Sequence, residues 1–142
     1  PEPRLQAYPP ETVVAEKLEA LVSLGMRNSR MKDFFDLWAI AKTFAFDGPT
    51  LARAVAATFA RRQTPFPDGT PIALTAAFID DASKQAQWTA FLRRTSIALA
   101  PEPLPELIAF VRSFAEPLLA SDAVEKFVAA AWPVGGPWQP NT

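Results

Sequence analysis

Prolines rather than glycines separate the apolar segments of this sequence, and no segment shows the sustained apolar–polar alternation of a strand. The chain has 15 prolines and only 5 glycines among its 142 residues. Proline is common in the first turn of a helix and rare inside a sheet, whereas tight hairpins usually need glycine. The pattern therefore predicts an all-α chain, a single helical domain of about five to seven helices.

Start and stop signals place these helices along the chain. The first is expected to begin at Pro9-Pro10 and to end before Gly25, and a third to begin near Asp47 and Pro49. The helical ranges expected from such signals are 10–24, 30–44, 46–63, 72–78, 81–96, 100–119 with a break near Pro117, and 121–131. Residues 1–7 are expected to be an extended segment, 8–131 the helical domain, and 132–142 a Pro/Gly-rich tail.

The composition excludes several kinds of chemistry. There is no cysteine and no histidine, which removes disulfides, thiolate metal sites and the commonest general base. The net charge of −1 gives no global basic field for nucleic acid. No apolar run reaches the roughly 20 residues of a membrane span, so a cytoplasmic protein without membrane contact is expected.

Lys17 is the first polar residue in an unexpected place. On a helical wheel it lies near the middle of an apolar arc, and the glutamates of the same helix lie outside that arc. The members of the arc are Val13, Val14, Ala20, Leu21 and Leu24. A lysine there either extends its ammonium group past the apolar face or meets a carboxylate.

The next helix offers such a carboxylate. Arg30 lies inside its apolar arc and Asp33 at the edge, while Lys32 and Asp36 lie on the opposite, solvated side, spaced for a weak surface pair. Because the turn between the helices is short, they should be antiparallel neighbours, with Lys17 within reach of Arg30 or Asp33. Two interpretations stay open: a buried salt bridge that fixes the hairpin, or charges that converge on an anionic substrate.

Two arginine pairs end other predicted helices, Arg61-Arg62 and Arg93-Arg94. Such pairs usually complement the negative end of the helix dipole in solvent. They could instead form a patch for an RNA backbone if both pairs share one face.

The segments "KLEA" at 17–20 and "RMKDFFD" at 30–36 resemble the C-terminal half of AbiEii/AbiGii-type nucleotidyltransferase toxins of abortive-infection and toxin–antitoxin systems. The resemblance implies the helical half of a polymerase-β-like nucleotidyltransferase, using Mg²⁺ and a nucleoside triphosphate, with tRNA as the acceptor in some members. It implies catalytic roles for Lys17 and Asp33, the latter as base or as the group that orients the lysine. It also implies that Arg30, Lys32 and Asp36 bind substrate or phosphate, and it assigns no metal ligand to this chain.

The chain departs from that family in lacking the Gly-Ser and D-x-D motifs of the N-terminal catalytic half. Its one Asp-Asp pair, Asp80-Asp81, opens a helix, where acidic residues are ordinary. We therefore expect a fragment or one part of a split protein, inactive alone, that binds no cofactor by itself. Its expected partners are the missing N-terminal domain or a second copy, and an antitoxin protein. The alternatives are a non-catalytic helical protein-interaction module and a scaffold in which Lys17 and Asp33 form a structural pair.

Overall fold

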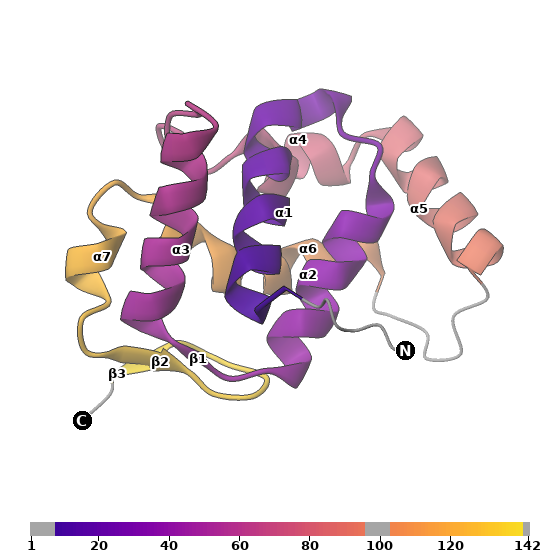
Figure 1. The fold of residues 1–142 in the computed structure, drawn as a ribbon. Coiled ribbons are helices and arrows are strands. Elements are labelled where there is room, and N and C mark those ends of the chain that lie inside the picture. The colour runs from indigo at the N-terminus through magenta and orange to yellow at the C-terminus, as the bar shows by residue number, and fades with distance from the viewer. Residues whose placement is uncertain (1–7, 96–102, 141–142) are drawn as a thin grey trace, which may run out of the picture.

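Helices make up most of the residues that the computed structural model describes, which are 8–95 and 103–140 (Figure 1). The predicted extended segment at 1–7 lies outside them. Within the described residues, the seven α-helices are α1 (Pro10–Leu24), α2 (Met31–Thr43), α3 (Gly48–Arg61), α4 (Ala76–Ile79), α5 (Ala82–Thr95), α6 (Leu104–Ala115) and α7 (Ala123–Lys126). Short 3₁₀ turns cover Gly25–Arg27, Ile72–Leu74 and Glu116–Leu119. The predicted fold class, a mostly helical single domain, is confirmed.

The predicted boundary residues of α1 and α3 act as expected. Gly25 ends α1 with a positive φ of 54°, and its N–H donates to the carbonyl oxygen of Leu21. Asp47 caps α3 by accepting hydrogen bonds from the hydroxyl and the backbone N–H of Thr50, at 2.7 and 3.0 Å. Both bonds favour the charged carboxylate and lower the pKa of Asp47.

The helices pack in pairs. In Figure 1, α1 lies between α3 and α2, α6 lies behind them, and α5 stands on the far side of α2. The most closely packed pairs are α1 with α3 and α2 with α6. The side of α1 that faces the core consists of Val14, Ala15, Leu18 and Leu21, which meet Phe34 and Leu37 of α2 in one continuous apolar core. None of the described helices is long and apolar enough to cross a membrane.

A small sheet at one end of the molecule was not predicted. Its strands β1 (Phe46–Asp47), β2 (Ala130–Trp132) and β3 (Gln139–Pro140) are antiparallel, and β2 is central. They are too short to show a periodic pattern. The sheet brings residues 130–132 against the start of α3, where a Cβ on Gly48 would lie 2.6 Å from the carbonyl oxygen of Ala130. The last predicted helix is correspondingly shorter than expected, because its final residues form β2.

Candidate functional site

Lys17 lies between two carboxylates of α2. Its Nζ is 2.9 Å from Oδ1 of Asp33 and 3.1 Å from Oδ2 of Asp36. The predicted neighbourhood of Lys17 and Asp33 is confirmed. The surface pair of Lys32 and Asp36 is present too, at 2.7 Å. Asp36 was expected on the solvated side, yet it is only 22% exposed because it also faces α1.

Arg30 joins the same group from the start of α2. Its Nε lies 2.9 Å from Oδ2 of Asp33, an ion pair that lacks the alignment of a hydrogen bond. Arg30 was expected within the apolar arc of α2, but its side chain is 60% exposed. The reason is that Arg30 precedes the first residue of α2, so it does not follow the helical wheel. Asp33 is buried, and it is the acidic residue that contacts both Lys17 and Arg30.

The helical wheel also misplaced the apolar face of α1. The buried residues centre on Leu18, and Glu19, expected outside the apolar arc, is among them. The carboxylate of Glu19 accepts a hydrogen bond from the Thr64 hydroxyl at 2.6 Å, which satisfies it away from water. Lys17 therefore lies beside the apolar face rather than at its centre.

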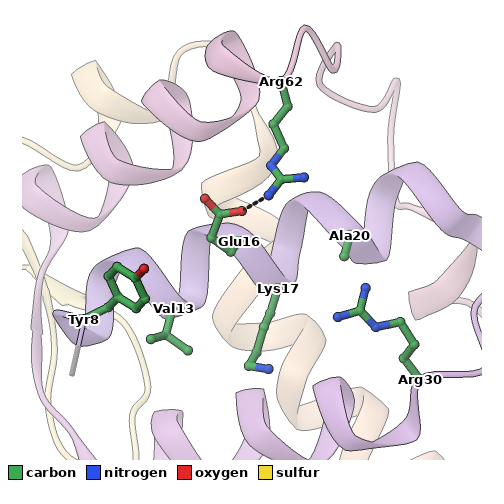
Figure 2. Close-up of a pocket in the computed structure, with 7 residues that line it drawn as sticks. All are labelled: Tyr8, Val13, Glu16, Lys17, Ala20, Arg30 and Arg62. Atoms are coloured by element: carbon green, nitrogen blue, oxygen red, sulfur yellow. Dashed lines mark ion pairs between the residues drawn. The ribbon is translucent and has the colours of Figure 1, made fainter. Parts of the chain in front are cut away.

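Lys17 and Arg30 open onto one surface pocket of about 280 Å³ (Figure 2). The outer side of α1 forms its floor, and the charged residues around it are Lys17, Arg30, Arg62 and Glu16. Its remaining lining residues are Tyr8, Val13 and Ala20. Asp33 does not line the pocket. The pocket thus presents three cations to solvent, while one of the carboxylates that hold them stays behind the surface.

Arg62 and Glu16 are the charged pocket residues that the sequence did not assign to this site. Figure 2 shows Glu16 leaving α1 on the side of Arg62, opposite to Lys17. Nη2 of Arg62 lies 2.6 Å from Oε1 of Glu16, and Arg61 forms an ion pair with the same carboxylate. The sequence carried no signal for this contact, because it depends on how α3 packs along α1.

The surroundings of Lys17 favour its charged form. Partial burial alone would lower the pKa of its ammonium group. Hydrogen bonds and charges from Asp33, and then from Asp36, outweigh that effect and raise the pKa of Lys17 above its ordinary value of 10.5. The site therefore holds a permanently cationic lysine at neutral pH and not a nucleophilic amine.

The donor set does not suit Mg²⁺. Among the described residues no group of three or more acidic side chains is placed to hold a metal ion. Asp33 and Asp36 are engaged by Lys17, Arg30 and Lys32. The carboxylate that lines the pocket, Glu16, is engaged by Arg61 and Arg62. A magnesium ion at this pocket would need oxygen ligands from other residues.

The two arginine pairs do not share a face. Figure 1 shows α3 and α5, which carry them, on opposite sides of α1 and α2. Arg62 belongs to the pocket, whereas Arg93 and Arg94 are exposed in the last turn of α5. A single RNA-binding patch made of both pairs is therefore excluded.

Comparison with known proteins agrees with the resemblance in the sequence. The family model described as "Nucleotidyl transferase AbiEii toxin, Type IV TA system" matches residues 1–116, which include every charged residue of the site. Neither the search of curated proteins nor the search of solved structures gave a match. The chain belongs to the AbiEii nucleotidyl transferase toxin family.

Proposed function

We propose that this chain supplies the phosphate-binding, helical side of a nucleotidyl transferase site. The observation that carries the proposal is the arrangement around Asp33, which holds two cations from behind while both face one pocket. Cations fixed in this way can meet the charge that develops on a transferring phosphoryl group without reorganising. Lys17 and Arg30 contact the phosphates in this proposal, and Arg62 adds a third positive charge at the opposite rim.

Asp33 is a positioning residue in this proposal and not a general base. It is 6% exposed, and its oxygens face Lys17 and Arg30. A base must reach the proton that it removes, and Asp33 does not line the pocket. Lys32 and Asp36 do not line it either; Asp36 supports Lys17 from the side, and Lys32 neutralises Asp36.

The metal-binding carboxylates of the reaction come, in this proposal, from a polypeptide segment other than these 142 residues. The support is that the sequence has no Gly-Ser followed by D-x-D and that the described residues offer no acidic cluster. The chain alone then binds triphosphate but transfers no nucleotide. A tRNA 3′ end is the acceptor that the family suggests, and an antitoxin is the partner that its toxin–antitoxin description implies.

Binding of inorganic tripolyphosphate tests the phosphate site directly. Isothermal titration calorimetry should show binding to the wild-type chain, and Lys17→Met and Arg30→Met should each weaken it about tenfold, equivalent to about 1.4 kcal/mol. Lys126→Met removes a 69% exposed cation of α7, which does not line the pocket, and is the control, expected to bind as wild type does. Equal affinities for all four proteins would refute a phosphate site at this pocket.

A transfer assay tests the second half of the proposal. The chain is incubated with Mg²⁺, labelled nucleoside triphosphates and tRNA, and no label should enter the RNA. Label transfer that disappears in Lys17→Met would show that the 142 residues are catalytic by themselves, and the split-site proposal would then be wrong.

A further inference from the structure

Lys84 of α5 is a buried lysine that the proposed function does not use. It is 6% exposed, and its Nζ donates a 2.8 Å hydrogen bond to the backbone carbonyl oxygen of Asn28. The ring of Phe78 lies 5.2 Å from the same ammonium group. No carboxylate of the described residues forms an ion pair with it. Burying an ammonium group costs free energy, and apolar packing alone does not offset that cost, so the hydrogen bond of Lys84 to Asn28 is the contact to explain.

The partner of Lys84 belongs to the turn that leads into the phosphate-binding pocket. Asn28 is 1% exposed and lies between the end of α1 and the start of α2. Its side-chain Oδ1 accepts a 2.8 Å hydrogen bond from the backbone N–H of Arg30, and its own N–H donates to Gly25. Asn28 is thus bonded on one side to α5 and on the other to Arg30.

The chain of contacts continues into the site. Arg30 pairs with Asp33, and Asp33 pairs with Lys17, each at 2.9 Å. Arg30 lies before the first residue of α2, so its backbone N–H has no acceptor within the helix and is held by Asn28 instead, while its carbonyl oxygen accepts from the N–H of Asp33 at 2.9 Å. The direction of the Arg30 side chain therefore depends on where this turn holds its backbone. Lys84 is the residue of α5 that supplies a hydrogen bond to this turn.

We propose that Lys84 is a positioning residue for the phosphate-binding pocket: through Asn28 it fixes the α1–α2 turn so that Arg30 faces the ligand. This inference rests on the proposed function of the pocket. It makes α5 part of the site, although no residue of α5 lines the pocket. The aromatic contact of α5 with α2, between Phe91 and Phe35, involves no residue of the turn.

The test compares Lys84→Met with Lys42→Met. Both lysines lie over a phenylalanine ring, Lys42 over Phe110 at 4.1 Å, but Lys42 is remote from the turn. Two readouts are taken where both variants are folded: tripolyphosphate affinity, and the NMR signal of the Arg30 Nε–Hε group, which senses the ion pair with Asp33. Lys84→Met should weaken binding about tenfold and move the Arg30 signal, and Lys42→Met should change neither.

Asn28→Ala keeps the inference testable if Lys84→Met does not fold. This variant removes the acceptor of the Arg30 N–H and leaves the backbone carbonyl that Lys84 binds, so it should also weaken binding and move the Arg30 signal. Wild-type affinity with an unmoved Arg30 signal in the folded variant would overturn the positioning role and leave the phosphate site intact. Failure of the wild-type chain to bind tripolyphosphate would instead overturn the proposed function, and this inference with it.

Discussion

Asp33 holds Lys17 from behind: its Oδ1 lies 2.9 Å from Lys17 Nζ, but only the lysine reaches the pocket. The ion pair is not fully buried, because Lys17 lines the pocket, and its two members do not both face the pocket, because Asp33 does not line it. The buried carboxylate of Asp33 thus holds the partly exposed ammonium group of Lys17 in place at the pocket. The salt bridge that the sequence suggested is present, whereas the convergence of these charges on an anionic substrate stays a prediction.

Replacing Asp33 should cost more stability than replacing Asp36. Asp33→Asn removes the charge that two cations share in a buried place, and we expect a loss of about 1–3 kcal/mol in the free energy of unfolding. Asp36→Asn is the matched control, because it removes a more exposed partner of the same lysine and should cost about 0.5–1 kcal/mol. Urea denaturation at pH 7 measures both. Equal losses would show that Asp33 is not the principal support of Lys17.

The raised pKa of Lys17 predicts a loss of stability in alkali. The folded protein binds this proton more tightly than the unfolded chain, so the contribution is complete below the ordinary lysine pKa of 10.5 and disappears as the pH rises through the folded value. Urea denaturation between pH 9 and about 11.5 should show the difference between wild type and Lys17→Met shrinking above 10.5. A constant difference across this range would contradict the raised pKa.

The ends of helices were predictable from the sequence where the chemistry of one residue determines where the helix begins or ends. Gly25 can adopt the positive φ that ends α1, and Asp47 can cap α3, so both boundaries are readable locally. The three strands were not predictable, because two or three residues carry no period and because α3 to α7 separate β1 from β2 in the sequence.

The site was predictable only in part, for a related reason. A short turn between two helices brings Lys17 and Asp33 together, and the sequence shows that turn. Glu16, Arg62 and Lys84 gain their roles from helices that are distant in sequence. The helical wheel also predicted that Glu19 would be exposed, because it takes no account of a distant partner such as Thr64, whose hydroxyl donates a hydrogen bond to the buried carboxylate of Glu19.

Neutralising Glu16 should strengthen phosphate binding. Glu16→Gln removes the negative charge among the pocket-lining residues, breaks the ion pair with Arg61 and leaves Arg62 its longer contact with Glu19, at 3.9 Å. We expect tripolyphosphate to bind about two- to fivefold more tightly, the range for one exposed charge. Glu11→Gln removes a glutamate of α1 that does not line the pocket and should leave affinity unchanged. Weaker binding by Glu16→Gln would mean that Arg62 needs Glu16 to hold its position.

Trp132 should matter more to stability than Trp138. Its indole N–H donates to the carbonyl oxygen of Ala41 at 2.8 Å, and the side chain is buried. Trp132→Phe loses this bond and leaves a gap, so we expect a loss of about 2–4 kcal/mol. Trp138→Phe loses a similar bond, to Phe114, in a partly exposed place and should cost about 1 kcal/mol. Thermal unfolding compares them, and the reverse order would contradict the burial of Trp132.

The antiparallel pairing of β1 with β2 has a consequence for synthesis of the protein. Phe46 lies opposite Trp132, and the family match ends at residue 116. Helices α1 to α3 leave the ribosome long before the residue that completes their core, so a nascent chain exposes apolar surface near Ala41 and Phe46 until Trp132 emerges. A chaperone bound during that interval, or a ribosome stalled before residue 132, would keep the domain from its native state even though every residue that lines the pocket had already been made.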